Sequence, residues 1–330
     1  MKKSLVLLAG AFLFGISCNK SVSPEDESQN NINEETFSTT QRSCASYEVL
    51  QQQLKDDPSL RQRMDAIEEF TQRVVSNPSQ YRLVNGVYEI PVIVNVLYKT
   101  TAQNISLTQI QSQIAVLNAD FAGTNGDYNA SNPYDAVKAG NTNIRFVIDN
   151  PATDIIRKKT NKTSWQLNDA MKKSTQGGIN PTSPTTKLNI WVCNLTSGYL
   201  GYAQFPGGAA ATDGVVIDDN AFGTTGTATA PFNKGRTATH EVGHWLNLRH
   251  IWGDATCGND QVGDTPLHNT ANYGCPAAGH RSTCTGTPLE MTMNYMDYTD
   301  DACMYMFSAG QKTRMLTTFL SGGGRESFAQ

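Results

Sequence analysis

The chain has little of several features that would place it in other functional classes. Its 330 residues contain 26 Lys and Arg against 30 Asp and Glu, without a concentrated basic stretch, so the charge pattern of a nucleic-acid-binding protein is missing. Its one long apolar run covers residues 5–16, which is too short for a membrane-spanning helix of roughly 20 residues. No internal repeat is present, so a repeat architecture is not expected.

The apolar run follows Lys2 and Lys3, an order that is typical of an export signal. Residues 15–18, Gly-Ile-Ser-Cys, are similar to a bacterial lipobox, in which the cysteine is lipidated and becomes the new N-terminus. We therefore expect a signal peptide at residues 1–17, with Cys18 as the candidate for a lipid anchor and the only link to a membrane. An ordinary signal peptide cut nearby is the alternative. Both interpretations predict an exported protein, secreted or lipid-anchored at the bacterial cell envelope.

Composition divides the rest of the chain into two parts. Residues 19–40 have almost no apolar content and are typical of a flexible tether. Residues 47–75 carry apolar side chains at near-helical spacing, interrupted once by a proline. From Tyr88 the chain is rich in β-branched residues, which predicts a buried strand. We expect a tether and helical propeptide at residues 18–80 and the main domain at residues 81–330.

The main domain is predicted to contain strand, helix, strand, helix, strand, strand, strand and helix in that order. Ser106 caps an amphipathic helix that ends before Gly123. Strands after the first are expected at residues 144–148, 188–193, 199–205 and 215–217. After His250 the regularity stops, and a last helix is expected at residues 308–320. The pattern predicts an α+β or α/β domain with a mixed sheet.

Residues with catalytic chemistry are concentrated at 237–250, Thr-Ala-Thr-His-Glu-Val-Gly-His-Trp-Leu-Asn-Leu-Arg-His. His240 and His244 are four residues apart, so on a helix both can bind one metal, while Glu241 can reach a water on that metal. His250 can join them only if the chain turns sharply, and Asn247 tolerates the left-handed backbone that such a turn requires. Three His ligands leave a fourth position open, as a catalytic zinc site requires.

A helix that contains histidines by chance is the alternative, because H-E-x-x-H occurs in many unrelated proteins. Three of the 5 His of this chain lie within one window of eleven residues. That concentration favours zinc as the cofactor.

The motif resembles that of the metzincin zinc metallopeptidases, and within them the pappalysin group, peptidase family M43, with its bacterial cytophagalysin- and ulilysin-like members. The metzincin pattern H-E-x-x-H-x-x-G-x-x-H is matched except at Asn247, where Gly is usual. A second hallmark, the Met-turn, resembles Asn-Tyr-Met-Asp-Tyr at residues 294–298. The resemblance implies that Met296 forms a hydrophobic floor beneath the ligands and that Tyr298 lies near the metal, where it could stabilise an oxyanion. Core packing is the alternative for both.

The resemblance spans about residues 80–320 and implies a metzincin-type α+β catalytic domain. Such a domain has a twisted, mixed five-stranded sheet, an active-site helix and a backing helix above the cleft, and an irregular lower subdomain that ends in a helix. An edge strand, expected at residues 201–205, would pair with extended protein or peptide substrates. With Glu241 as general base for a zinc-activated water, we expect a monomeric zinc metalloendopeptidase.

The cysteines of the irregular half are candidates for disulfides, since four cysteines allow three pairings. The family resemblance favours Cys257 with Cys284 and Cys275 with Cys303. A structural zinc site is the alternative, although the usual C-x-x-C spacing is absent. Cys193 lies in an apolar strand, where a free buried thiol is expected.

Cys44 lies in Arg-Ser-Cys-Ala, which resembles the Cys-switch of several metzincin propeptides. The resemblance implies a zymogen in which the Cys44 thiolate occupies the open zinc position. An unpaired thiol without a role is the alternative.

Two further sites follow from the family resemblance, an acidic substrate pocket and a calcium site. Asp300 and Asp301 follow the Met-turn, which in this fold runs along the pocket for the residue after the scissile bond, so an acidic floor that prefers Arg or Lys is expected. Residues 258–265 offer oxygens suited to calcium. The family similarity points to Asp260, Thr265 and the carbonyls of Asn259 and Val262. The alternatives are solvated carboxylates and an Asx-rich turn.

Two other functions compete with the peptidase. The first is a binding protein that keeps the zinc site as a scaffold, and Glu241 argues against it because a scaffold needs no base beside the metal. The second is an exported zinc hydrolase of glycans or small amides, which would leave denatured protein uncut.

Overall fold

A computed structural model describes residues 41–77 and 86–328. All of them belong to one compact unit, residues 38–330. The expected signal peptide, Cys18 and the tether lie outside the described residues, as does the expected boundary near residue 80. Within the described ranges, no helix combines the length and apolar character needed to cross a membrane.

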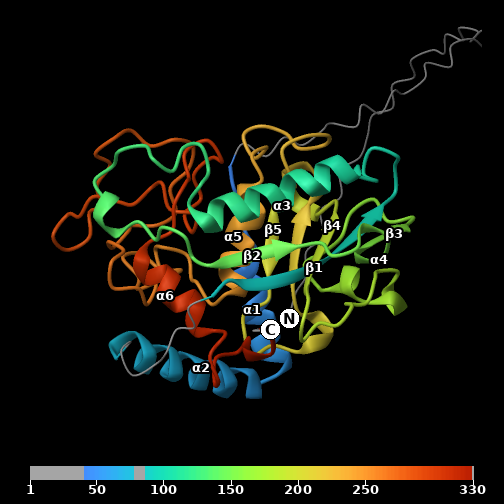
Figure 1. Ribbon diagram of the computed structural model, residues 1–330, viewed down its shortest axis with the longest axis horizontal. Coiled ribbons are helices and arrows are strands. Elements are labelled where there is room, and N and C mark those ends of the chain that lie inside the picture. The colour runs from blue at the N-terminus through green and yellow to red at the C-terminus, as the bar shows by residue number, and fades with distance from the viewer. Residues whose placement is uncertain (1–40, 78–85, 329–330) are drawn as a thin grey trace, which may run out of the picture. The chain divides into compact units, whose positions relative to one another are not determined.

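The centre of the domain is a six-stranded mixed sheet in the order β2-β1-β4-β6-β5, with β3 also paired to β1 (Figure 1). Its strands are β1 (Tyr88–Tyr98), β2 (Ile144–Val147), β3 (Ile155–Lys159), β4 (Leu188–Cys193), β5 (Gly201–Ala203) and β6 (Val215–Asp218). The pairs of β1 with β2, β3 and β4, and of β4 with β6, are parallel. Strand β5 is antiparallel to β6 and forms one edge of the sheet.

Strand β3 is the difference from the expected five strands, and it lies between residues 148 and 188, where the predicted order has a helix. A helix does begin behind the Asn150 cap, but α4 (Pro151–Asp154) is a single turn. The β-branched Ile155 and Ile156 then extend the chain beside β1. Three basic residues follow them and interrupt the apolar pattern by which a strand is recognised in sequence.

The helices of the domain lie on different sides of the sheet. They are α1 (Ser46–Asp56), α2 (Ser59–Ser76), α3 (Leu107–Ala122), α5 (Arg236–Trp245) and α6 (Ala309–Thr317). Helices α3 and α5 pack against each other; α3 also contacts β2, and α5 contacts β5 and β6. These are the expected backing and active-site helices. Helix α3 has the predicted Ser106 cap and ends at Gly123, whose φ is 64°.

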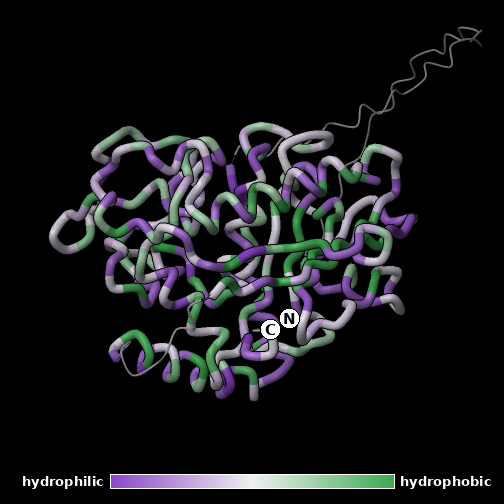
Figure 2. Tube along the Cα trace, in the orientation of Figure 1, coloured by the Kyte–Doolittle hydropathy of each residue, from purple (hydrophilic) through white to green (hydrophobic). Residues whose placement is uncertain are grey.

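The sheet is buried on both faces, which accounts for its nearly continuous apolar strands (Figure 2). In β4, Ile190 and Val192 belong to the larger hydrophobic cluster, which includes residues of α3 and α5. Trp191 and Cys193 belong to the second cluster on the opposite face. Cys193 is a buried free thiol, as expected.

The segment between α5 and α6 has neither helix nor regular strand in the structure. It contains the disulfides Cys257–Cys284 and Cys275–Cys303, the pairs that the family resemblance implies. Cross-links of this kind limit the unfolded chain where few regular hydrogen bonds hold the backbone. The lower subdomain is therefore irregular and disulfide-stapled, as predicted.

Candidate functional site

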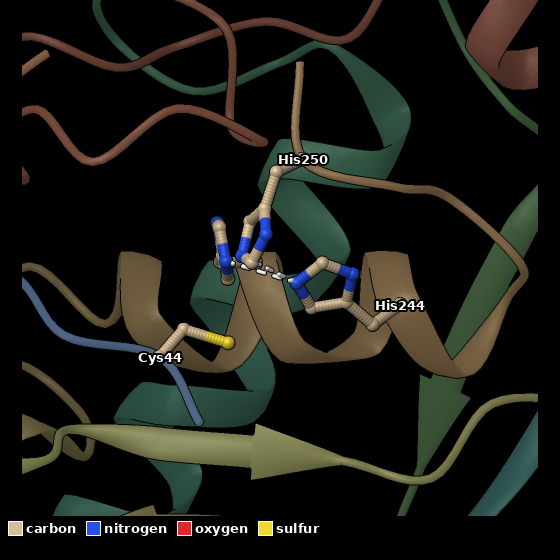
Figure 3. A group of neighbouring side chains, drawn as sticks. Cys44, His244 and His250 are labelled. Carbon is tan, nitrogen blue, oxygen red and sulfur yellow. Dashed lines mark hydrogen bonds between the residues drawn. The ribbon is translucent and has the colours of Figure 1, made fainter. Parts of the chain in front are cut away.

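Helix α5 and the turn after it bring three imidazoles to one point. The Nε2 atom of His244 lies 3.1 Å from Nε2 of His240 and 3.1 Å from Nε2 of His250. The turn that carries His250 back is made at Asn247, whose φ is 70°, so the predicted left-handed residue is confirmed. All three rings are buried. In Figure 3 the Cys44 sulfur points toward this group of rings.

The second nitrogen of each ring has its own acceptor. Nδ1 of His240 lies 2.7 Å from the Tyr295 carbonyl oxygen, and Nδ1 of His244 lies 2.8 Å from that of Leu248. Because these acceptors carry no hydrogen, Nδ1 is the protonated nitrogen and the Nε2 lone pairs converge. Burial lowers the pKa of His240 well below its usual value and that of His244 to about 3, so both rings are neutral. Converging neutral imidazoles fit a divalent zinc ion.

Asp254 supports the third His, and the sequence interpretation missed it. Its Oδ1 atom lies 2.5 Å from Nδ1 of His250. A carboxylate in this position orients a metal-binding imidazole and raises its basicity. An acidic residue four positions after the third His is visible in the sequence. The backbone between them is a turn rather than a helix, so the spacing alone could not predict that Asp254 contacts His250.

Glu241 is buried beside the three rings. Its Oε2 atom accepts hydrogen bonds from Ser46 Oγ at 2.9 Å and from Cys44 Sγ at 3.3 Å. Burial raises the pKa of Glu241 to about 7, although these two hydrogen bonds act in the opposite direction. Gly201 of β5 leaves room for it, since a Cβ there would lie 3.1 Å from Glu241 Oε1 and 2.8 Å from the Val216 carbonyl oxygen.

Met296 and Tyr298 lie at the boundary of the site. The Met296 sulfur would lie 2.5 Å from a Cβ at Gly243, so the Met-turn packs directly against α5 between His240 and His244. The Tyr298 hydroxyl donates to the Cys44 carbonyl oxygen at 3.0 Å and accepts from the Cys44 N–H at 3.3 Å. Met296 thus packs against the helix that carries His240 and His244, and Tyr298 contacts the Cys44 backbone.

The segment before α1 lies along β5 in the parallel direction. Cys44 forms an isolated parallel bridge with Gly201, with hydrogen bonds from Leu200 N to Ser43 O and from Ala45 N to Gly201 O, each 2.9 Å. Cys44 Sγ and one nitrogen of each of the three His lie within 4.8 Å of one another. Burial, and then the charge of Glu241, raises the pKa of the Cys44 thiol.

Arg42 extends from this segment into a buried acidic pocket. Its guanidinium donates to Asp301 Oδ1 at 2.5 Å, to Thr237 Oγ1 at 3.0 Å and to the Thr299 carbonyl oxygen at 3.2 Å. Asp301 is fully buried. Asp300, the other predicted pocket residue, is partly exposed and makes no hydrogen bond to Arg42 among the described contacts. The structure therefore separates the two carboxylates.

The predicted calcium ligands lie in one closed turn. Thr265 Oγ1 is 2.9 Å from both carboxylate oxygens of Asp260 and 2.9 Å from the Val262 carbonyl oxygen. The side chain of Asn259 accepts from the Gln261 N–H. These four residues are thus adjacent, as calcium binding requires, and they are equally compatible with an Asx-rich turn.

Known proteins that resemble this chain agree on one family. The profile of the M43 peptidases, described as pregnancy-associated plasma protein-A, matches residues 182–320. An extracellular metalloprotease of Verticillium alfalfae is 34% identical over 241 residues, which are 69% of this chain and 77% of that protein. One from Sordaria macrospora is 31% identical over 269 residues, covering 76% of this chain and 83% of that protein.

Solved structures extend the agreement to the fold. A variant of Tannerella forsythia promirolysin superimposes with a TM-score of 0.78 at 41% identity, covering 87% of this chain and 97% of that chain. Mature mirolysin from the same organism, in complex with a cleaved peptide, has a TM-score of 0.70 at 44% identity and covers 74% of this chain and 96% of that chain. With the histidine cluster, the Met-turn and the fold in agreement, this chain belongs to the M43 family of metallopeptidases, the pappalysin group of the metzincins.

Proposed function

We propose that this protein is an exported zinc endopeptidase that is made as a zymogen and uses Glu241 as its general base. The observation that carries the proposal is the convergence of three imidazole nitrogens beside a buried carboxylate, next to the edge strand β5. His240, His244 and His250 would hold zinc and leave a fourth position open.

Zinc bound by these residues would supply a Lewis acid for a water molecule and for the scissile carbonyl. Glu241 takes the proton from the attacking water and passes it to the leaving amine. The Tyr298 hydroxyl, now paired with the Cys44 backbone, would donate to the developing oxyanion. Asp254 positions His250.

The outer edge of β5 is suited to an extended substrate once residues 43–45 have left it. Residues 43–45 already pair with it through backbone groups, which shows that the edge accepts a further strand. Pairing of this kind recognises backbone rather than side chains. Protein and peptide substrates, shared with the metalloproteases that this chain resembles, would bind there once residues 42–46 have left.

The contacts of residues 42–46 support latency. They cover the edge of β5, engage Glu241 and Tyr298, and fill the Asp301 pocket, so a substrate could not bind at the same time. The promirolysin structure covers 87% of this chain and the mature one 74%, as expected if the N-terminal segment corresponds to part of a pro-form. We infer that residues 18 to about 80 are a propeptide and that Cys44 binds the open zinc position.

Replacing Cys44 by alanine in the full-length chain is expected to raise the basal rate of peptide hydrolysis by about tenfold or more, because one ligand that competes with water is lost. The rate is measured before any proteolytic cut, with the intact mass of the protein verified. Cys193→Ala is the matched control, since Cys193 is the other buried free thiol and lies on the far face of the sheet. Equal latency of Cys44→Ala and wild type would remove Cys44 from the switch.

We also propose calcium at Asp260, Thr265 and the carbonyls of Asn259 and Val262. A calcium-selective chelator is then expected to lower the melting temperature by several degrees, since a bound ion stabilises only the folded state. The measurement is a thermal melt with and without added calcium, repeated with Asp260→Asn. If the Asp260→Asn variant still responds to calcium as wild type does, the ion binds elsewhere.

Export and oligomeric state complete the proposal. The relatives are named extracellular metalloproteases, in agreement with an export signal at residues 1–17. We infer a monomer, which size-exclusion chromatography tests. Mass spectrometry of the mature N-terminus decides between a lipid on Cys18 and an unmodified end.

The function as a whole is tested by removing and restoring the metal. Protein freed of its first 80 or so residues is incubated with gelatin and a peptide library, with a zinc chelator and then with zinc added back. Cleavage that disappears and returns is expected, because catalysis depends on the ion. Protein that stays silent in all conditions while binding zinc would instead be a non-cleaving binding protein.

A further inference from the structure

The turn between the second and third His determines where two of the three imidazoles lie. Asn247 is left-handed there, and its side-chain Nδ2 is buried without a partner among the described residues. The next residue, Leu248, holds His244 through its carbonyl oxygen. Only two residues later comes His250. A small displacement of this turn would therefore move two of the three converging imidazoles.

Arg314 of α6 holds the turn from the other side. Its Nε–H donates to the Asn247 carbonyl oxygen at 2.6 Å. The side chain is 1% exposed, so the bond is shielded from water. Arg314 is 67 residues away in sequence, and it touches neither zinc ligands nor the substrate edge in the described contacts. Its effect on the site must pass through the backbone of the turn.

The remaining nitrogens of the same guanidinium bind α2. Glu68 Oε1 accepts from Arg314 Nη1 at 2.9 Å, and Glu68 Oε2 accepts from Nη2. Helices α2 and α6 lie side by side in Figure 1 and are in contact. The bidentate geometry aligns the guanidinium plane, and that alignment directs Nε toward Asn247.

Helix α6 also holds the Met-turn, one helical turn before Arg314. Gln311 and Asn294 form a reciprocal amide pair, with distances of 2.8 and 2.9 Å. Asn294 in turn accepts from the Met296 N–H. Residues three apart share a face of a helix, so one face of α6 supports both the floor of the site and its third-ligand turn.

We propose that Arg314 is a positioning residue for the third metal ligand, acting through the Nε–H bond to the Asn247 carbonyl. Glu68 docks the predicted propeptide on the same guanidinium. The inference rests on the proposed zinc site, because it concerns how His250 is held for the metal. The charge of Arg314 serves the Glu68 contact, and the Nε–H donor serves the turn.

Two substitutions separate the donor from the charge. Arg314→Gln keeps an N–H at the same number of bonds from the backbone and loses the charge. Arg314→Lys keeps the charge and puts a methylene at that place. In the full-length chain, Arg314→Lys is expected to weaken zinc binding by about tenfold or more, as loss of outer-shell support does, and Arg314→Gln to bind zinc nearly as wild type.

Two measurements read out the turn. Zinc affinity is obtained by competition with a chromophoric chelator, and amide hydrogen exchange of residues 246–250 is followed in metal-free protein, below the melting temperature of each variant. Exchange should be faster in Arg314→Lys than in Arg314→Gln. Arg249→Lys is the matched control, because Arg249 also faces Glu68, at 3.8 Å, without a hydrogen bond to Asn247 among the described contacts.

The reverse order of the two variants, or wild-type zinc affinity and exchange in Arg314→Lys, would overturn the proposal. If Arg314→Lys does not fold, Arg314→Leu takes its place against Arg314→Gln, since it also lacks the donor. A wild-type chain that binds no zinc contradicts the proposed function instead, and hydrogen exchange in metal-free protein then still decides whether Arg314 holds the turn.

Discussion

The activated enzyme with Glu241→Gln is expected to lose peptide hydrolysis by a factor of about 10² to 10⁴, the usual contribution of a general base. The buried carboxylate lies beside the three imidazoles and contacts neither their Nε2 nor their Nδ1 atoms among the described hydrogen bonds. Glutamine has the same shape, so zinc should stay bound. The measurement is kcat/KM on a peptide that the wild-type enzyme cleaves, together with zinc content by atomic absorption.

A matched control is Glu89→Gln. Glu89 of β1 forms an exposed ion pair with Arg145 of β2, and the substitution removes the same charge there. Activity of that variant should equal wild type, because surface pairs of this kind contribute little. The smallest loss expected for a general base is about 10². A Glu241→Gln enzyme that keeps more than a tenth of the wild-type rate would therefore mean that another group takes the proton. Loss of zinc from this variant would mean that Glu241 supports the metal instead.

The second large effect is expected at the pocket that Arg42 fills. We infer that a substrate residue after the scissile bond takes the place of Arg42 when the propeptide leaves, so that Arg or Lys is preferred there. Asp301→Asn should then lower kcat/KM for a peptide with Arg at that position by about 10² to 5 × 10³, since a buried charge pair that loses one partner costs about 3–5 kcal/mol. A peptide with Leu there should be cut no more slowly than before.

Asparagine is chosen because Asp301 has a second task. Its Oδ2 atom accepts from the Lys234 N–H at 2.7 Å and from the Arg236 N–H at 3.2 Å, at the start of α5. The amide oxygen of Asn can keep these bonds while its NH₂ group faces the guanidinium and repels it. α5 therefore stays in place, and the loss can be attributed to the pocket.

Asp300→Asn is the control for this experiment. The residue is adjacent in sequence, carries the same charge and has no hydrogen bond to Arg42 among the described contacts. Cleavage before Arg should persist in that variant. If Asp300→Asn reduces it as much as Asp301→Asn does, general electrostatic attraction rather than the buried contact selects the substrate.

Much of the fold was predictable from local sequence. Helix α3 has its Ser cap and its terminal Gly, and β1 and β4 are largely apolar because both faces of the sheet are covered. The misreading fell on β3, where only two of five residues are apolar. It pairs with the second half of β1 because of where the chain lies after α4. The periodicity of apolar residues does not predict that position.

The metal site divides in the same way. Helical spacing alone brings His240 and His244 together, and the tolerance of Asn for a left-handed backbone predicted the turn that carries His250. Ser46 and Arg314 carry no such signal because they come from distant segments, and the spacing of Asp254 could not place it because the backbone before it is a turn. They were found only in the structure.

The sequence by itself predicted the three His, the Glu beside them and the Met-turn, and it carried the likeness to one peptidase family, because these depend on residue identity and on spacing within single elements. Tertiary structure decided which of Asp300 and Asp301 receives Arg42, and that α2 and α6 meet at one guanidinium behind the third ligand. The physical reason is that hydrogen bonds between segments depend on how the chain packs, and packing brings together residues whose separation in sequence has no period.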